Sequence, residues 1–206
     1  SSVFNPLTGL SQHVGNWTGK TVERKTGWHR ENGHVLEIVD LPGTYSLTAN
    51  SPEEQVARDY ILTGRPDVVV VIVNAASLER TLYLVAEMLE LPPPVVVGLN
   101  MTDVAEGQGL RVEAKVLQAA LGVPVVPMAA AHGRGLKELV RAIEQVYDGS
   151  FAYEPTRPDL GAETEALVAE VERLIGADAP APYPRRWLAL KLLEGDKEVT
   201  DRVRAH

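Results

Sequence analysis

The sequence predicts a doubly wound α/β domain followed by a small all-helical domain. Two apolar runs rich in valine, residues 67–73 and 95–99, are typical of buried strands in a mostly parallel sheet with helices on both faces. Amphipathic helical patterns alternate with such runs as far as Tyr147, and only helical patterns follow it. We therefore expect two domains, at residues 1–149 and 150–206, the second without a clear stop signal at its end.

The composition is that of an ordinary globular chain and excludes several classes of protein. Of 206 residues, 45% are apolar and 23% charged, which suits one packed domain with an appendage. A net charge of −8 argues against a nucleic-acid partner, because such binding relies on clustered Lys and Arg. No apolar run approaches the roughly 20 residues that span a bilayer. We expect a soluble, cytoplasmic piece, which does not exclude a membrane segment in a longer parent chain.

The first elements are a helix, a loop and a hairpin. Residues 1–9 read as a helix already under way, with Val3, Phe4 and Leu7 on one face, and residues 10–20 read as a polar loop. Two strands should follow, joined by a turn that contains the Asn-Gly hairpin signal. Their expected ranges are 21–28 and 33–39.

Strands and helices then alternate. Proline at 92–94 and Gly122 should each end a helix, and Pro-Thr-Arg-Pro at 155–158 reads as a linker. The expected strands span 67–73, 95–99 and 124–128, and the expected helices 53–62, 78–91, 112–121, 136–147, 162–175 and 185–193. In the helix at 162–175, we expect one apolar face made by Leu167, Val168, Val171, Leu174 and Ile175.

Two polar tetrapeptides, at residues 40–43 and 100–103, close strand-like runs, and such loops are where open α/β sheets bind ligands. In the first, Asp40 can face Mg²⁺ through a coordinated water. Gly43 lets a backbone N–H approach a terminal phosphate without a Cβ in the way. Taken alone, this tetrapeptide is equally well explained as a strand followed by a Pro-Gly turn.

The second tetrapeptide, Asn100-Met101-Thr102-Asp103, is more specific. The carboxylate of Asp103 can accept hydrogen bonds from guanine N1–H and the exocyclic amine, whereas adenine offers a mismatched edge. Asn100 would brace the neighbouring loops. Both residues could instead form a helix cap or an Asx turn, but the preceding strand and the first tetrapeptide favour guanine recognition.

Further candidates lie in two other loops. The Thr21 hydroxyl can close on Mg²⁺ when a γ-phosphate is present, although a lone Thr is more often a plain strand residue. The backbone N–H groups of residues 129–133 can reach guanine O6. We interpret His132, within that segment, as a surface loop residue, and no histidine spacing suits zinc. The scattered carboxylates are interpreted as solvated faces, so no iron site is expected.

The phosphate-cradling motif G-x-x-x-x-G-K-[ST] is absent, yet residues 1–9 are what should follow its lysine. Ser1 would then be the Mg²⁺ ligand of that motif. A sheet without its central strand would expose an apolar edge. We therefore expect the sequence to begin after a first strand and a phosphate loop.

Together these motifs resemble the ferrous iron transport protein B family over almost the whole chain. The loop at 14–17 and the strand start at 21–25 are the most specific part. The matching segments are Phe4-Asn5 to Gly9, Val14-Gly15-Asn16-Trp17 to Gly19, Thr21-Val22-Glu23-Arg24-Lys25, Asp40 to Leu47, Leu78-Glu79-Arg80 with Leu82-Tyr83-Leu84, Leu99-Asn100-Met101 with Asp103, Arg185 to Leu188 and Leu193 to Asp196. The resemblance implies the cytosolic N-terminal region of a membrane iron transporter, namely a Ras-like P-loop GTPase domain followed by a helical domain that resembles a GDP-dissociation inhibitor.

The resemblance also implies a role for each site residue. The roles are Mg²⁺ ligation by Ser1, Thr21 and Asp40, catalysis by Thr21 and Gly43, and binding of GTP or GDP by Asp40, Gly43, Asn100, Met101, Asp103, Ala130 and Ala131. Two departures are visible: Ala130 stands where the family usually has Ser, and Asn74 where relatives often have Asp. Thr44 follows Gly43 where Ras-type enzymes place a water-orienting Gln, so hydrolysis should be slow. The family also suggests activation by K⁺ through an Asn upstream of Ser1.

The leading hypothesis is a GTP-hydrolysing switch at the cytoplasmic face of the cell membrane. It would control Fe²⁺ passage through a transmembrane domain of the same parent chain, with loops 10–27 and 43–52 reporting the γ-phosphate. The helical domain would relay that state to the membrane. Two alternatives are an RNA- or ribosome-associated GTPase, disfavoured by the acidic charge, and a nucleotide sensor with little hydrolysis, suggested by Thr44 and Ala130. Assembly into a homo-oligomer is left open.

Overall fold

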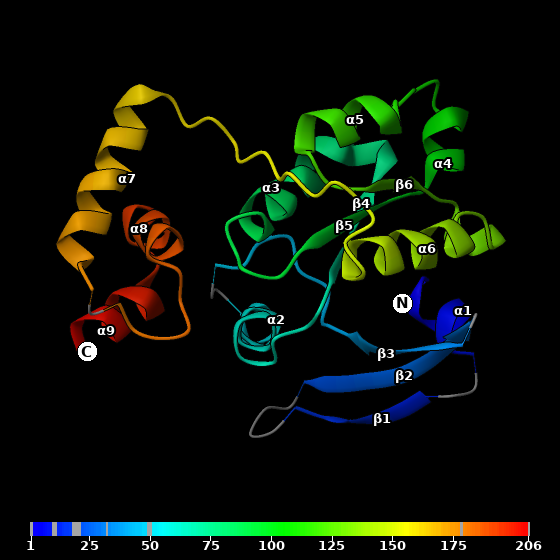
Figure 1. Cartoon of the computed structure of the whole chain (residues 1–206), viewed down its shortest axis with the longest axis horizontal. Coiled ribbons are helices and arrows are strands. Elements are labelled where there is room, and N and C mark those ends of the chain that lie inside the picture. Colours follow the sequence, from blue (N-terminus) through cyan, green and yellow to red (C-terminus); the bar gives the residue numbers. More distant parts are fainter. Residues whose placement is uncertain are drawn as a thin grey trace.

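The strands form two three-stranded sheets, shown as arrows in Figure 1. The computed structural model describes residues 2–9, 12–17, 22–31, 33–48, 51–177 and 179–205. The antiparallel sheet contains β1 (Gln12–Asn16), β2 (Glu23–Glu31) and β3 (His34–Asp40), in that order. The parallel sheet contains β4 (Val69–Asn74), β5 (Val95–Asn100) and β6 (Val125–Pro127), also in that order.

The antiparallel sheet confirms the predicted hairpin but adds a strand. β2 pairs with β3 from Lys25↔Asp40 to Glu31↔His34. β1 occupies part of the stretch that we expected to be a loop, and that expectation was wrong. As an edge strand, β1 pairs only with β2 and leaves Val14 56% exposed, so its sequence lacks the apolar alternation of a half-buried strand.

The parallel sheet follows the valine runs as predicted. Every residue of β5 is buried, because this strand lies between β4 and β6 and helices cover both of its faces. Val95, Val97 and Leu99 face one apolar cluster together with side chains of α3 (Leu78–Met88). Val96 faces a second cluster that includes α6 (Leu136–Tyr147) and α1 (Phe4–Thr8).

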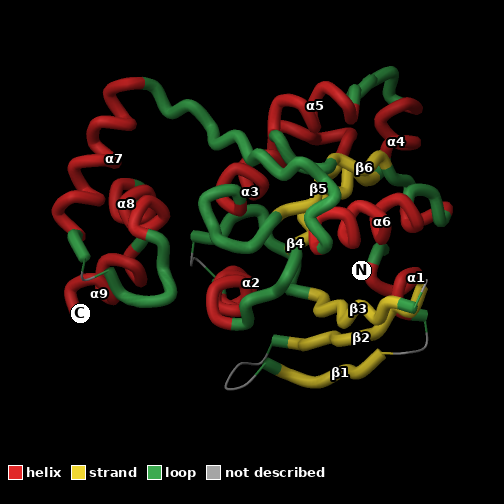
Figure 2. Tube along the Cα trace, in the orientation of Figure 1, coloured by secondary structure: helices red, strands yellow, loops and turns green. Residues whose placement is uncertain are grey.

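The second cluster also joins the two sheets. It includes Leu36 and Ile38 of β3 as partly buried neighbours, together with Val3 and Leu7 at α1. In Figure 2, α1 and α6 lie between the parallel sheet and β3. The apolar face of α1 predicted from the sequence is therefore buried as expected.

The remaining helices agree with the sequence with a few differences. α2 (Pro52–Thr63) begins after a Ser51 N-cap, whose hydroxyl accepts a hydrogen bond from Glu54 N at 3.2 Å, and Pro52 lies in its first turn. The other helices are α4 (Thr102–Gly107), α5 (Ala114–Leu121), α7 (Ala162–Ile175), α8 (Arg185–Leu193) and α9 (Lys197–Ala205). Two 3₁₀ turns are η1 (Ala75–Ser77) and η2 (Ala130–His132). The six-residue α4 was not expected, because it is too short to show a helical period.

The start of the expected linker and the two residues before it are docked on the first domain. The Tyr153 hydroxyl accepts a hydrogen bond from Val95 N at 2.7 Å, Glu154 N donates to the Gly122 carbonyl at 3.2 Å, and Thr156 N donates to the Leu121 carbonyl at 2.9 Å. Gly122 has φ +66°, and a Cβ there would lie 1.8 Å from the Glu154 carbonyl oxygen. Glycine is therefore required both to end α5 and to let the linker approach.

The helical domain, formed by α7, α8 and α9, lies beside α2 and α3 (Figure 1). Its centre is Trp187, which is 1% exposed and stacks on Tyr183 with ring centroids 5.4 Å apart. On α7, Val168 is buried, but Leu167 and Leu174 are 53% and 68% exposed. The single apolar face expected for this helix was therefore only partly correct. In the described ranges, none of the helices is both long and apolar enough to cross a membrane.

Candidate nucleotide-binding site

Asn100 ties together the loops that follow β5 and β6. The end of β5 places its side chain inside the protein, where it is 7% exposed. Its Oδ1 accepts a hydrogen bond from Ala130 N at 3.0 Å. The expectation that Asn100 braces neighbouring loops is confirmed. The N–H groups of the other residues in 129–133 all donate within the loops, so the expected backbone donors to guanine O6 narrow to Ala131.

The next two residues fix the start of α4. Thr102 donates to the Met128 carbonyl twice, from its backbone N at 3.1 Å and from Oγ1 at 2.9 Å. Met101, which lies between the bonded residues Asn100 and Thr102, adopts a left-handed conformation with φ +61° and ψ +33°. This conformation costs a non-glycine residue about 1–2 kcal/mol. That bend turns the chain so that Asp103 enters the first turn of α4.

The loop after β6 is a closed turn. Ala129 N donates to the Arg134 carbonyl at 3.1 Å, and Arg134 N returns a bond to the Ala129 carbonyl at 3.2 Å. Gly135 has φ +85°, and a Cβ there would lie 2.5 Å from the Pro127 carbonyl oxygen. Glycine at 135 therefore lets the turn fold back on β6. We call residues 100–103 and 128–135 the base-side loops.

Asp103 contacts a histidine within the base-side loops. Its Oδ2 lies 3.1 Å from Nε2 of His132, and the two side chains are 26% and 66% exposed, respectively. His132 is exposed, as expected for a surface loop residue, but its contact with the Asp103 carboxylate was missed. The two residues lie on different loops, and nothing in the sequence pattern joins them.

The phosphate-side candidates lie on the other sheet. Asp40 is the last residue of β3, where partial burial raises the pKa of its carboxyl above the ordinary value, while Lys25, its register partner on β2, acts in the opposite direction. A Cβ added to Gly43 would meet nothing within 4 Å, so its backbone is open to an approaching ligand. Thr44 uses its hydroxyl within its own turn, donating to the Ser46 carbonyl.

The loop that follows Gly43 contacts the helical domain through buried charges. Leu47 N donates to Oε2 of Glu87, on α3, at 2.8 Å. Lys191 of α8 donates to the other oxygen of Glu87, to Thr48 Oγ1 at 3.1 Å and to Glu194 Oε2 at 2.7 Å. Lys191 is 1% exposed. Burial disfavours its charge, but the neighbouring carboxylates outweigh this effect and raise its pKa.

A second buried cation joins α2 to the helical domain. Arg58, fully buried, donates to Oδ2 of Asp196 at 3.3 Å and also to Glu198. The other oxygen of Asp196 accepts from Val199 N at 3.0 Å and so caps α9. We call Arg58, Glu87, Lys191 and Asp196 the domain contact. The interpretation of the carboxylates as solvated faces was wrong for Glu87, Glu90 and Asp196, which are buried.

The structure thus places the predicted residues in two groups. The base-side loops bring together Asn100, Met101, Asp103, Ala130 and Ala131. Asp40 and Gly43 come from the end of β3 in the antiparallel sheet. Ser1 and Thr21 lie outside the described residues. Within the described ranges, no group of three or more His, Asp and Glu side chains could hold a metal ion.

Comparison with known proteins identifies the family of this chain. Residues 1–143 match the family model described as ferrous iron transport protein B, and residues 161–206 match the model of the FeoB cytosolic helical domain. The Fe(2+) transporter FeoB of Shigella flexneri is 44% identical over 203 residues, which is 95% of this chain. A Porphyromonas gingivalis fusion of Fe(2+) transport protein A with FeoB is 41% identical over 97% of this chain. The chain spans about a quarter of the length of these relatives.

Solved structures give the same result. The cytosolic domain of the T. maritima FeoB iron transporter in a GDP form aligns with a TM-score of 0.91 and 36% identity, over 99% of this chain and 80% of that one. Its GMPPNP form aligns with a TM-score of 0.86 and 36% identity, with the same coverage. The cytosolic domain of L. pneumophila FeoB gives 0.87 and 34%, over 98% and 79%. The chain therefore belongs to the ferrous iron transport protein B family.

Proposed function

We propose that this chain binds guanine nucleotide, hydrolyses GTP and acts as the cytosolic switch of a ferrous iron transporter. The observation that carries the proposal is the set of contacts within the base-side loops. Asn100 to Ala130, Thr102 to Met128 and Asp103 to His132 join two loops that leave neighbouring parallel strands. Such loops at the carboxyl edge of a parallel sheet are where α/β domains bind ligands.

Guanine fits the chemistry of these loops. The Asp103 carboxylate accepts from N1–H and from the exocyclic amine, and the Ala131 N–H donates to O6. Adenine would leave that carboxylate facing an acceptor, which costs binding energy. Relatives of this chain support the choice, because the T. maritima cytosolic domain has been solved in GDP and GMPPNP forms.

Mg²⁺ fits the residues on the phosphate side. It prefers hard oxygen ligands, and Asp40 offers a carboxylate that burial has made harder to ionise without a cation. Ser1 and Thr21 would add hydroxyl ligands. The bound ion would neutralise charge on the phosphates, while the Gly43 backbone N–H would donate to a terminal phosphate oxygen.

Hydrolysis by this chain alone should be slow. The side chain after Gly43 is Thr44, which bonds within its own turn and does not present a water-orienting amide. We propose that Thr21 and backbone groups orient the attacking water, and that K⁺ supplies further activation through residues upstream of Ser1.

The domain contact offers a route from nucleotide to membrane. The loop after Gly43, which should report the γ-phosphate, is held by Glu87 through Leu47 N and by Lys191 of α8 through Thr48. A shift of this loop would therefore change the hydrogen bonds of Lys191 in the helical domain. We propose residues 1–149 as the GTPase domain and 150–206 as the helical relay. The iron path would lie in the remainder of a parent chain about four times longer, and homo-oligomers of that chain are compatible with this arrangement.

The test is GTP turnover by the intact protein in Mg²⁺ buffer, with K⁺ or with Na⁺. We expect slow phosphate release that K⁺ accelerates, and binding of GDP but not of ADP. An Asp103→Asn variant should lose GDP and gain xanthosine diphosphate, because an amide matches the altered base edge. GDP binding without turnover would instead favour a nucleotide sensor, the candidate that Thr44 suggests. No guanine nucleotide binding would refute both.

A further inference from the structure

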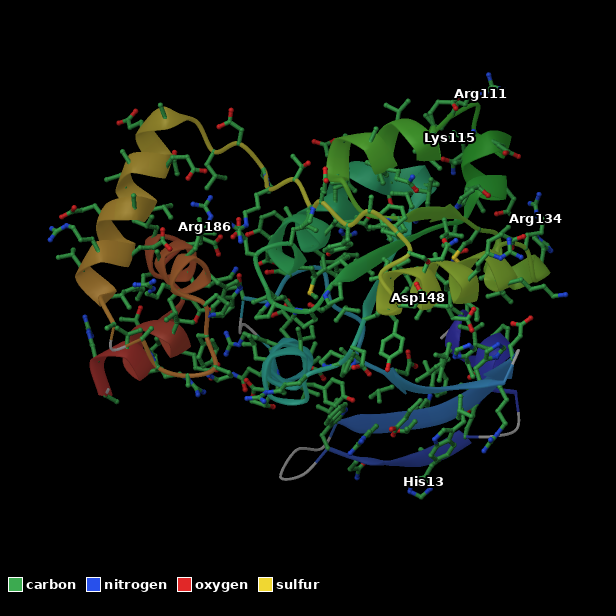
Figure 3. The ribbon with its side chains drawn as sticks, in the orientation of Figure 1. His13, Arg111, Lys115, Arg134, Asp148 and Arg186 are labelled. Atoms are coloured by element: carbon green, nitrogen blue, oxygen red, sulfur yellow. The ribbon has the colours of Figure 1, made fainter. Side chains whose placement is uncertain are left out.

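His132 is held rigidly at the end of η2. Its backbone N donates to the Ala129 carbonyl at 2.9 Å, and the following Gly133 continues the turn with φ +68°. Ala129 is itself bonded to Arg134, which Figure 3 labels at the edge of the molecule where α6 begins. The imidazole therefore projects from a turn that backbone hydrogen bonds close.

That imidazole meets one specific oxygen. Nε2 of His132 lies 3.1 Å from Oδ2 of Asp103. A carboxylate oxygen only accepts hydrogen bonds, so Nε2 is the donor, and it can donate in the neutral tautomer as well as in the protonated ring. In the described part of the chain, no other hydrogen bond or ion pair to this carboxylate is found.

The neighbouring loop offers Asp103 no side-chain donor at Ala130. That side chain is a methyl group, and the Ala130 backbone N–H is committed to Asn100. In the part of the chain that the structure describes, the His132 imidazole is the donor that reaches the carboxylate. A carboxylate free to rotate would lose part of its ability to read two donors on one base edge.

The contact with His132 leaves room for the base. A carboxylate has about four lone-pair sites, so Oδ2 can accept from the imidazole while Oδ1 and the second lone pair of Oδ2 face N1–H and the 2-amino group. The His132 side chain is 66% exposed and Asp103 is 26% exposed, so the carboxylate stays open to a ligand beside the imidazole.

We propose that His132 is a positioning residue for guanine recognition: its Nε2–H holds the Asp103 carboxylate in the orientation that reads both donors of the base. The inference rests on the proposed function, because it concerns how the same site selects its ligand. Its chemical consequence is a preference for bases that carry the exocyclic 2-amine, and so for guanine over hypoxanthine.

The test compares GDP with inosine diphosphate, which lacks the 2-amine, in equilibrium binding to the intact protein. In His132→Ala, the Kd for GDP should rise about three- to tenfold, since the lost bond is charge-assisted but exposed. The preference for GDP over inosine diphosphate should fall by a similar factor. His132→Gln, which restores an N–H donor of similar reach, should recover most of both. His34→Ala, at an exposed histidine at the start of β3, is the matched control and should change neither.

A double variant isolates the pair. In an Asp103→Ala background, which removes the accepting oxygens, His132→Ala should change the remaining GDP affinity by less than about twofold, because the carboxylate that it positions is gone. Unchanged GDP affinity and base preference in His132→Ala would overturn the inference, and tighter GDP binding would show that His132 competes with the base. If the unaltered protein binds no guanine nucleotide, the proposed function itself fails, which is a different result. Urea unfolding should show that His132→Ala folds normally, and His132→Gln carries the test should it not.

Discussion

The base-side loops and the domain contact use polar side chains in opposite ways. In the base-side loops, a buried amide and an Asp–His contact hold two loops that leave polar groups open to a ligand. In the domain contact, Lys191 and Arg58 are almost wholly enclosed, and each donates to a carboxylate more than 100 residues away in the chain. A third cation, Arg186 of α8, is labelled in Figure 3. It is 19% exposed and donates to Glu90 and Glu165.

The difference has an energetic meaning. An exposed ion pair contributes about 0–1 kcal/mol to stability, so the base-side loops can exchange partners with a ligand at little cost. Removing one member of a buried pair leaves an uncompensated charge and typically costs about 3–5 kcal/mol. Changes in the base-side loops should therefore alter binding, and changes in the domain contact should alter folding and the communication between domains.

The largest expected effect is that of Lys191→Met. It keeps the length and apolar contacts of the side chain but leaves buried Glu87 without its cation, so the free energy of unfolding should fall by about 3–5 kcal/mol. Urea or thermal unfolding of the intact protein measures it. Lys197→Met, at an exposed site on α9, is the control and should change stability by less than about 0.5 kcal/mol.

Pairing that variant with Glu87→Gln sharpens the result. The double variant removes both charges, so it should recover part of the loss, with a coupling energy of about 1–3 kcal/mol between the two sites. Purely additive losses would mean that Lys191 acts through packing against Trp187, whose ring centroid lies 5.9 Å from its Nζ, rather than through Glu87.

An intermediate effect is expected for Asn100→Ala. It leaves the buried Ala130 N–H without its acceptor, which should cost about 1–3 kcal/mol and loosen the loop that meets the base. Asn74 is a matched control, because it pairs with Asn100 in register at the end of β4 and its Oδ1 caps η1 through Ala76 N at 2.9 Å. Asn74→Ala should lose about 1 kcal/mol of stability. GDP affinity should weaken in Asn100→Ala only. Equal weakening in both variants would contradict the role of the bond from Ala130 N to Asn100 in holding the loop.

The sequence predicts the base-side loops well because the information there is local. Asn100 and Asp103 stand three residues apart directly after a valine-rich run. The apolar run, the place where it ends and the two polar side chains that follow therefore all indicate the same site. The valine runs likewise predict the parallel sheet, because full burial on both faces requires unbroken apolar runs. The edge strand β1 escaped prediction, because pairing with one neighbour needs no apolar pattern.

The domain contact could not be predicted from pattern. Lys191 and Glu87 lie 104 residues apart, and Arg58 and Asp196 lie 138 apart. A charged residue at a helical position looks the same in sequence whether it faces water or a buried partner on another domain. The contact between Asp103 and His132 was missed for a related reason, because it depends on how the turn after β6 folds back towards α4.

The smallest expected effect is that of Thr48→Val. This variant tests whether the bond between Thr48 and Lys191 couples the loop after Gly43 to α8. Valine keeps the shape of threonine but removes Oγ1, which accepts from Lys191 Nζ at 3.1 Å and from Ser46 Oγ at 3.0 Å. Lys191 retains Glu87 and Glu194, so stability should fall by only about 1 kcal/mol. GDP affinity should not change, because the loop that contains Thr48 is expected to report the γ-phosphate, which GDP lacks. If the loop after Gly43 reports to α8 through this bond, hydrogen exchange at Leu47 should quicken while exchange at Ala130 stays constant. Unaltered exchange at both amides would place the relay in Glu87 alone, since it holds the Leu47 N–H directly.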